Sequence, residues 1–368
     1  MPWNWELPKW PHFDCDFDQI AQLEKQFLLS AGGASAFLKS LAEEESKRFV
    51  VEILSLEGVE SSKIEGEILD RESLQSSIKR HFGLDAPSKK EAKKESQMAD
   101  LLLNVYETFE KPLTHEMLWQ WHSMLFDDQS SIDDFGKYRT HPEPMQIVSS
   151  RSGASKVFFE APPSDTVFAE MEKFIHWFNQ PSRAGSILGQ AAIAHVYFES
   201  IHPFKDGNGR IGRILVEKLF SQDAKKPVLI ALSKVLEKRK KDYYSKLEKC
   251  SRTLKVQDWV EFFAGAALQA QDEAKTLLFF LIEKSKLLTS LSGQINQRQE
   301  KVLLRMFAEG PNGFQGGLSA ENYISITKTS RATSTRDLND LVEKGALVKT
   351  GEFRHTRYHL KVELELHG

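Results

Sequence analysis

The chain reads His-Pro-Phe-Lys-Asp-Gly-Asn-Gly-Arg-Ile-Gly-Arg from His202 to Arg213, between two stretches with helical periodicity. Gly207 and Gly209 permit backbone conformations and close approaches that a Cβ atom would forbid, so the N–H groups of this turn can point together at an anion. The helix that begins there adds the positive end of its dipole. The segment therefore predicts a loop and helix N-terminus that bind phosphate.

Four side chains flank this predicted phosphate site. Arg210 and Arg213 lie three residues apart on the helix, so both can reach the same side and bind phosphate oxygens. Asp206 offers a hard oxygen ligand, which suits a Mg²⁺ ion that bridges the protein to a di- or triphosphate. His202 has the ordinary pKa of a base that removes a proton from a hydroxyl near neutral pH. The combination indicates transfer from a nucleotide to a nucleophile.

Each feature alone is ordinary, because His-Pro is usually a turn, Asp-Gly-Asn-Gly a tight loop, and arginines three apart a solvated helix face. Together they complete the signature His-x-Phe-x-Asp/Glu-Gly-Asn-Gly-Arg-x-x-Arg, with all eight specified positions met. The chain thus resembles Fic-domain protein adenylyltransferases, which move AMP from ATP onto Ser, Thr or Tyr hydroxyls of target proteins.

The resemblance implies a role for each motif position. His202 would deprotonate the target hydroxyl, Asp206 would hold Mg²⁺, and Phe204 would anchor the loop in the core. The Gly-Asn-Gly turn would hold the α- and β-phosphates of ATP, and the two arginines the outer phosphates. The expected nucleotide-binding residues are Gly207, Asn208, Gly209, Arg210, Gly212, Arg213, Tyr243 and Tyr244. The two tyrosines could stack on adenine and ribose, or they could simply pack in the helix core.

A second motif, Ser61-Ser62-Lys63-Ile64-Glu65-Gly66, lies at the end of a predicted helix, where Ser61 and Glu65 share one face. It meets the Fic inhibitory pattern Ser/Thr-x-x-x-Glu-Gly/Asn in the N-terminal position that defines the family's second class. The resemblance implies that Ser61, Glu65 and Gly66 are inhibitory. Glu65 would pair with Arg213, so that ATP binds in a pose unsuitable for in-line attack. The same glutamate could instead align a water for removal of AMP.

Two strand-like runs, Met145-Gln146-Ile147-Val148 and Lys156-Val157-Phe158-Phe159, flank a turn-rich segment. They predict a β-hairpin from about Met145 to Phe159. In Fic proteins a hairpin at this position is called the flap. The flap pairs with the main chain of the target by strand addition. An ordinary edge hairpin would have the same pattern. We expect a target protein to bind through this hairpin.

Helical periodicity covers most of the remaining chain. From Asp16 to about Glu67 apolar residues recur at spacings near 3.6, and we expect Gly32-Gly33 to break the run. Residues 86–96 are charged and poor in apolar side chains, which favours a solvated connection. Further helices are expected at about 97–110, 115–126 with Thr114 as N-cap, 164–180, 186–200, 209–222, 233–250 and 256–291. The expected domains are an N-terminal helical region with the inhibitory helix (1–95), the Fic catalytic core (96–290) and a winged-helix module (291–368).

The first dozen residues hold Trp3, Trp5 and Trp10 among prolines, which predicts an extended arm packed on the body. This segment resembles the domain of unnamed function often found ahead of Fic cores. Its tryptophans need burial, either within the chain or across a dimer, so a homodimer stays open.

The C-terminal residues predict three short helices, at 297–308, 319–326 and 330–344, followed by two strands around a tight turn, which is a winged-helix pattern. Residues 294–361 hold eleven Lys or Arg against seven Asp or Glu. This local excess of four is small for a DNA-binding module, and the same fold often docks proteins. We expect protein docking, with DNA binding as the alternative.

The 368 residues carry 49 basic and 52 acidic side chains, which gives a formal charge of −3. The net charge therefore does not favour binding to nucleic acid or to an anionic membrane. The two cysteines lack zinc-ligand spacing and form no disulfide framework. No apolar run reaches the ~20 residues of a membrane span, and the start has no signal-peptide pattern. We expect a cytoplasmic protein with no membrane partner.

These observations predict a mainly α fold: a Fic helical core with a β-hairpin flap, an N-terminal helical region and a C-terminal winged helix-turn-helix. The predicted function is autoinhibited transfer of AMP from ATP, with Mg²⁺, to target proteins and to the enzyme itself. Two alternatives remain, a de-AMPylating hydrolase and a winged-helix transcription regulator whose nucleotide site senses rather than catalyses.

Overall fold

The computed structural model is mainly helical and divides into two compact units, Met1–Asp272 and Glu273–Gly368. It describes residues 2–85, 92–126, 134–148, 157–180, 185–311, 313–314 and 316–362, without the side chains of 32–37 and 39–40. The first unit contains the predicted N-terminal region together with most of the predicted core. The boundaries at residues 95 and 290 stay predictions of the sequence.

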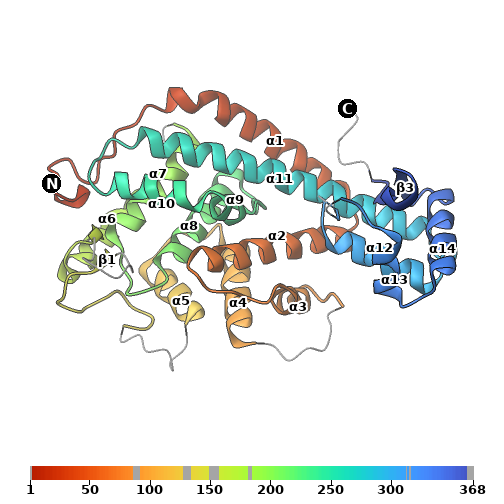
Figure 1. The fold of residues 1–368 in the computed structure, drawn as a ribbon. Coiled ribbons are helices and arrows are strands. Elements are labelled where there is room, and N and C mark those ends of the chain that lie inside the picture. Colours follow the sequence, from red (N-terminus) through yellow and green to blue (C-terminus); the bar gives the residue numbers. More distant parts are fainter. Residues whose placement is uncertain are drawn as a thin grey trace. The chain divides into compact units, whose positions relative to one another are not determined.

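Figure 1 shows the helices of the first unit, with the β1–β2 hairpin in the long connection between α5 and α6. They are α1 (Ala21–Ser40), α2 (Glu43–Ile64), α3 (Arg71–His81), α4 (Lys93–Thr108), α5 (His115–Leu125), α6 (Val167–Phe178), α7 (Ile187–Ile201), α8 (Asn208–Ala224), α9 (Leu232–Lys238), α10 (Lys240–Cys250) and α11 (Gln257–Ser290), which continues into the second unit. Strands β1 (Gln146–Val148) and β2 (Val157–Glu160) pair antiparallel, and 3₁₀ helices lie at Asn4–Glu6, Phe17–Ile20 and Ser164–Thr166. The hairpin and most of the helices agree with the sequence pattern.

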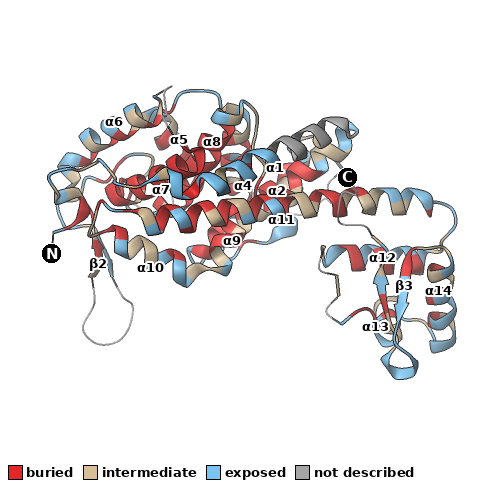
Figure 2. Cartoon of the chain, turned by 90° about the horizontal axis from the view of Figure 1, so that it is seen from above, coloured by how far each residue is buried: buried red, intermediate tan, exposed pale blue. Residues whose placement is uncertain are grey.

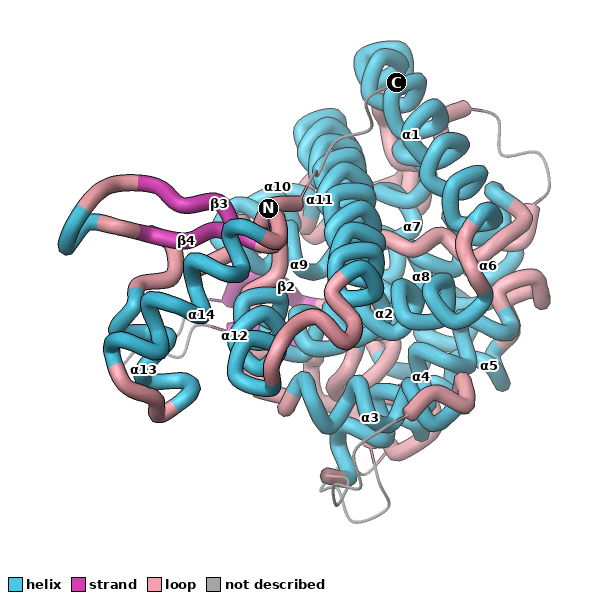
Figure 3. Tube along the Cα trace, turned by 90° about the vertical axis from the view of Figure 1, so that its right-hand side faces the viewer, coloured by secondary structure: helices cyan, strands magenta, loops and turns pink. Residues whose placement is uncertain are grey.

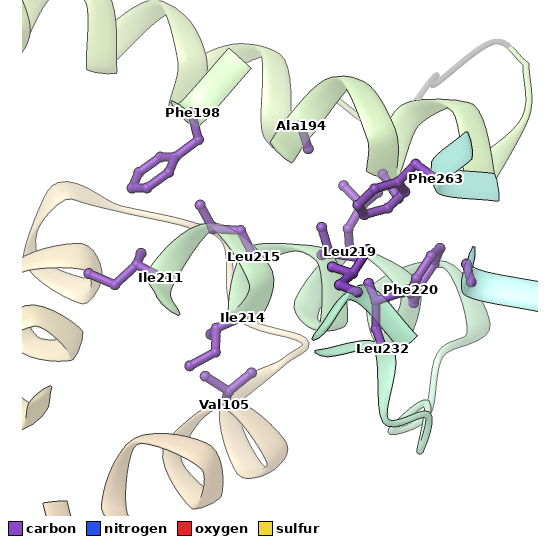
Figure 4. Packing of buried hydrophobic residues seen from close by; sticks show 14 of the residues in the cluster. Val105, Ala194, Phe198, Ile211, Ile214, Leu215, Leu219, Phe220, Leu232 and Phe263 are labelled. Atoms are coloured by element: carbon purple, nitrogen blue, oxygen red, sulfur yellow. The ribbon is translucent and has the colours of Figure 1, made fainter. Parts of the chain in front are cut away.

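Helix α7 forms the centre of this unit and packs against α8. It is buried along almost its whole length (Figure 2). In Figure 4, Phe198 on α7 faces Leu215 on α8, while Val105 on α4 lies against Ile214. Each buried side chain of this size contributes about 1.5–3 kcal/mol relative to an exposed one. The segment between α7 and α8, which carries the motif, is therefore fixed at both ends by the core.

Three details of the sequence prediction are wrong. Helix α1 runs through Gly32 and Gly33, which cost only about 1 kcal/mol each in a helix, while Phe27 is buried against Phe220. The stretch 233–250 is two helices, broken at Arg239. Helix α3 was not predicted, because its polar sequence shows only a narrow apolar face, which buries Leu74 and Ile78.

The N-terminal arm is folded rather than extended. Its first turn is a 3₁₀ helix, where the Trp3 N–H donates to the Glu6 carboxylate at 2.6 Å. Trp3 itself is buried within the chain, edge-on to Phe159 of strand β2.

The second unit holds α12 (Gln297–Ala308), α13 (Ala320–Thr327) and α14 (Arg331–Glu343), followed by strands β3 (Leu347–Thr350) and β4 (Arg357–Leu360), which flank a 3₁₀ turn at Phe353–His355. The two strands pair antiparallel, and Figure 3 shows them side by side. Asp337 on α14 accepts a hydrogen bond from Tyr323 and pairs with Arg298, which ties the three helices together. The three helices and the two paired strands follow the order that the sequence pattern predicted for this module.

Candidate active site

A cleft of about 1370 Å³ opens in the first unit beside the loop between α7 and α8. Its walls come from segments far apart in the sequence: the motif loop, the β1–β2 hairpin, the end of α2, and α10. The predicted site residues on its lining are Glu65, His202, Asp206, Gly207, Asn208, Gly209, Tyr243 and Tyr244. The fold therefore brings the two sequence motifs and the hairpin to one cavity.

His202 ends helix α7 in the left-handed conformation, with φ 50° and ψ 59°. Burial, and to a smaller extent the nearby Arg139 guanidinium, lower the pKa of His202 to about 4. The imidazole is therefore neutral at pH 7, which is the form that accepts a proton. Glu199, one turn earlier, places Oε2 3.7 Å from His202 Nδ1, and burial raises the pKa of Glu199 to about 8.

Arg139, which sequence reasoning missed, holds this loop in place. Its fully buried side chain donates from Nε to the His202 carbonyl at 2.9 Å and from Nη2 to the Pro162 carbonyl at 2.6 Å. Its own N–H donates to the Pro203 carbonyl at 2.9 Å. One side chain thus joins the motif loop to the base of the hairpin. No sequence motif surrounds Arg139, so its role becomes visible only from its burial in the folded structure.

Asn208 closes the motif loop on itself. Its Nδ2 donates to the Phe204 carbonyl at 2.7 Å, and its Oδ1 accepts from the Phe204 N–H at 2.9 Å. Phe204 is fully buried and stacks on His122 with ring centroids 4.4 Å apart. The Asn208 side chain is therefore committed to the loop. The remaining candidate donors to an anion are backbone N–H groups at the start of α8, which follows Gly207 with its φ of +81°; the N–H of Gly207 itself donates to Asp206 Oδ1.

Arg213 is buried and already paired in this structure. Its Nη2 donates to Glu65 Oε1 at 2.7 Å and to the Ser61 carbonyl at 2.9 Å, and its Nε donates to Ser61 Oγ at 2.9 Å. Burial raises the pKa of Glu65, but the Arg213 guanidinium outweighs this effect and keeps the pKa below its ordinary value. The pairing expected between the two motifs is present.

Arg210, one turn earlier on α8, is held by a residue that the sequence did not single out. Glu67 Oε2 lies 2.8 Å from Arg210 Nη1. Within the part of the chain that the structure describes, Arg210 Nε and Arg213 Nη1 are buried N–H groups without a hydrogen-bond partner. Buried donors without partners are costly, so these atoms are available to an anionic ligand.

The remaining predicted residues fall in different places. Tyr244 donates to the Ile64 carbonyl at 3.3 Å, and Lys240 donates to the same carbonyl, so both hold the end of α2. Tyr243 is fully buried and its hydroxyl lies 2.7 Å from His195 Nε2. Gly212 packs against α7, because a Cβ there would lie 2.9 Å from Glu199 Oε1. Gly212 thus serves helix packing and does not line the cleft.

The hairpin beside the cleft is supported by the N-terminal arm. Trp5 Nε1 donates to the Glu160 carbonyl of β2 at 2.8 Å, and Asn4 donates to Ser200 Oγ on α7 at 2.7 Å. Strand β1 is exposed and pairs Ile147 with Phe159. The tip of the predicted hairpin, residues 149–156, lies outside the described residues.

Asp206 is the candidate ligand for Mg²⁺. Its side chain is 62% exposed at the mouth of the cleft, and Oδ1 lies 3.8 Å from Arg210 Nη2. Among the described residues no cluster of three or more His, Cys, Asp or Glu side chains could hold a metal by itself. One carboxylate next to a phosphate site nevertheless fits Mg²⁺, which keeps several waters and takes phosphate oxygens as ligands.

The sequence of the chain is similar to known protein families and to curated proteins. Residues 112–220 match the Fic/DOC family, and residues 3–84 match a family described as a domain of unknown function (DUF4172). A protein named protein adenylyltransferase Fic from Drosophila mojavensis is 29% identical over 134 residues, covering 36% of this chain and 26% of that protein. A probable protein adenylyltransferase from Aquifex aeolicus is 30% identical, covering 24% of this chain and 33% of that protein. The chain thus aligns with only a quarter to a third of the length of these curated relatives.

Solved structures support the fold. A Fic family protein from Desulfovibrio desulfuricans has a TM-score of 0.51 at 23% identity, covering 93% of this chain and 96% of that one. A Fic-domain signalling protein from Bacteroides thetaiotaomicron has a TM-score of 0.52 at 20% identity, covering 68% of this chain and 95% of that one. In the described parts of the chain, no helix is both long and apolar enough to cross a membrane. Residues 112–220 thus match the Fic/DOC family, and the structure has the fold of Fic-family proteins.

Proposed function

We propose that the protein is an adenylyltransferase that moves AMP from ATP to a hydroxyl of a target protein. One observation carries the proposal: a neutral, buried His202 lies on the same cleft as the glycine turn at the start of α8. A general base must share a site with the groups that hold the phosphates. The adenylyltransferase names of the curated relatives agree with it.

In this mechanism a ring nitrogen of His202 takes the proton from the target hydroxyl. The hydroxyl oxygen forms a bond to the α-phosphorus of ATP, and the bond from that phosphorus to the bridging oxygen breaks as pyrophosphate leaves with the electron pair. The backbone N–H groups at the start of α8 hold the phosphates, and Arg210 and Arg213 balance their charge. Mg²⁺, held by Asp206, would neutralise charge on the leaving group.

Glu65 is proposed to restrain this reaction. The Nε and Nη2 groups of Arg213 already donate to Ser61 and Glu65. Because the Arg213 side chain is only 1% exposed, moving Glu65 away without a replacement anion would leave a buried charge unpaired, which is costly. Relief therefore requires movement of the end of α2, which Lys240 and Tyr244 also hold.

The β1–β2 hairpin is proposed to bind the target. Strand β1 is the exposed partner, and an extended peptide can add to such an edge through main-chain hydrogen bonds. The proposal leaves open the choice among Ser, Thr and Tyr.

The test uses purified wild type, Glu65→Gly and His202→Ala with Mg²⁺ and ATP labelled at the α-phosphate. Label on protein that is strongest in Glu65→Gly and absent in His202→Ala is the expected result. Absence of label in every variant would overturn the proposal. Release of AMP from a modified target that is lost in Glu65→Gly would indicate a hydrolase instead.

A further inference from the structure

The chain after the inhibitory motif makes a second contact with helix α8, through Arg210, one of the two arginines predicted to bind phosphate. Glu67 pairs with Arg210 at 2.8 Å, and the Arg210 side chain is only 8% exposed. The ring of Phe126 lies on the same guanidinium, 5.0 Å from its centre. Arg210 is thus enclosed by an aromatic ring and a carboxylate that belong to other parts of the chain.

The backbone turns so that two carboxylates reach helix α8. Gly66 has φ +84°, a left-handed conformation that other residues rarely adopt, and the Glu67 N–H donates to the Ser62 carbonyl at 3.0 Å. Glu65 meets Arg213 and Glu67 meets Arg210, which is one turn away on α8. Lys94 Nζ on α4 lies 2.5 Å from Glu67 Oε1, the carboxylate oxygen that does not contact Arg210. This second ion pair holds the Glu67 carboxylate in place.

We propose that Glu67 is a second restraining carboxylate, which competes with a phosphate of ATP for Arg210 independently of the hold of Glu65 on Arg213. The inference rests on the proposed function for the identity of the nucleotide. Carboxylate and phosphate make the same charge-assisted bonds with a guanidinium, so each excludes the other from one donor. A triphosphate that approaches Arg210 also meets the negative charge of Glu67.

A purely supportive role predicts the opposite result. If Glu67 served to aim Arg210 at the phosphate, its removal would leave the guanidinium poorly placed and weaken nucleotide binding. If Glu67 competes, its removal frees the donor and strengthens binding. The direction of the change therefore decides between the two roles.

The binding test uses full-length protein that carries His202→Ala, so that no turnover occurs. Calorimetric titration with Mg·ATP compares this protein with versions that also carry Glu67→Gln or Glu52→Gln. The second is a matched control, because Glu52 is exposed to a similar degree, 23% against 24% for Glu67, and pairs with Arg71 at 2.6 Å rather than with Arg210. We expect Glu67→Gln to lower the Kd about fivefold, as the loss of one partly buried competing pair implies, and Glu52→Gln to change it less than about twofold.

An unchanged or higher Kd in Glu67→Gln would overturn the inference. Thermal unfolding of each variant checks that the fold is intact, and Glu67→Ala serves as a second variant if Glu67→Gln is unstable. Label transfer provides an independent check, because adding Glu67→Gln to Glu65→Gly should lower the KM for ATP about fivefold at similar kcat. Equal KM values would overturn the independence of the two carboxylates. Absence of label in Glu65→Gly would instead overturn the transferase proposal and leave the binding result standing.

Discussion

The two walls of the cleft are built in different ways. The motif wall, between α7 and α8, is fixed by buried apolar packing and by the paired hydrogen bonds between Asn208 and Phe204. The end of α2 buries Ile64 in the core, but it also meets α8 through ion pairs, whose carboxylates on Glu65 and Glu67 are 30% and 24% exposed. Apolar packing resists local movement, whereas partly exposed ion pairs exchange for other ions. On the proposed function, the motif wall is the permanent catalytic part, and the end of α2 is a restraining wall whose ion pairs a nucleotide can replace.

The largest effect should come from the motif wall. His202→Ala removes the ring that is placed as a base, so we expect label transfer to fall by a factor of about 10²–10⁴. The ATP affinity and the unfolding temperature should stay close to those of the parent. Residual transfer near the parental rate would show that another group takes the proton.

The restraining wall should give the next largest effect, in the opposite direction. Glu65→Gly frees Arg213 and should raise the rate of label transfer about tenfold or more, since one ion pair of a few kcal/mol is removed. Glu60→Gln is the control, because Glu60 contacts Lys63 on the same helix at 3.5 Å. An equal rise in both variants would mean that the helix was merely loosened.

Asn208→Ala tests whether the motif wall is as firm as its hydrogen bonds indicate. The change leaves the Phe204 N–H and carbonyl unpaired, so we expect a loss of about 1–3 kcal/mol in the free energy of unfolding. Chemical denaturation measures this loss, and label transfer should fall with it because the anion turn loses its shape. Unchanged stability would mean that other groups fix the loop.

A smaller effect is expected where the N-terminal arm meets the hairpin. Trp5→Phe keeps an aromatic ring but removes the donor to Glu160, one hydrogen bond worth about 1 kcal/mol. Transfer to a protein target should fall a few-fold, while ATP affinity stays constant. A change in ATP affinity would contradict a role confined to the hairpin.

The rate of label transfer should change very little with pH in the neutral range. In Glu65→Gly the groups that face His202 are Arg139 and Glu199, and the pKa of His202 is lowered from 6.5 to about 4. The base stays neutral as pH falls through 6.5, so initial rates should vary less than about twofold between pH 5.5 and 7.5. A half-loss of rate near pH 6.5 would show that His202 titrates like an exposed histidine.

Local sequence patterns predicted the elements that local chemistry controls. The hairpin strands and the Thr114 cap of α5 followed from spacing and residue type. The pairing of Glu65 with Arg213 was implied by the resemblance to Fic proteins and is present in the structure. Arg139 and Glu67 could not be found in this way, because each acts through a partner more than sixty residues away in the chain. Gly32-Gly33 failed as a helix stop because tertiary packing outweighed the small helix propensity cost. The sequence shows which residues are charged, whereas the partner of each charged residue is determined by the fold.

The covalent connection between the restraining wall and the motif wall has a consequence for control. On the proposed function, Glu65 and Glu67 act as ligands tethered to the arginines that they hold, with an effective concentration on the order of millimolar. A tethered ligand does not dissociate on dilution, as a separate inhibitor protein would. The degree of restraint should therefore be the same at every level of expression, and it should respond to the concentration of nucleotide in the surroundings.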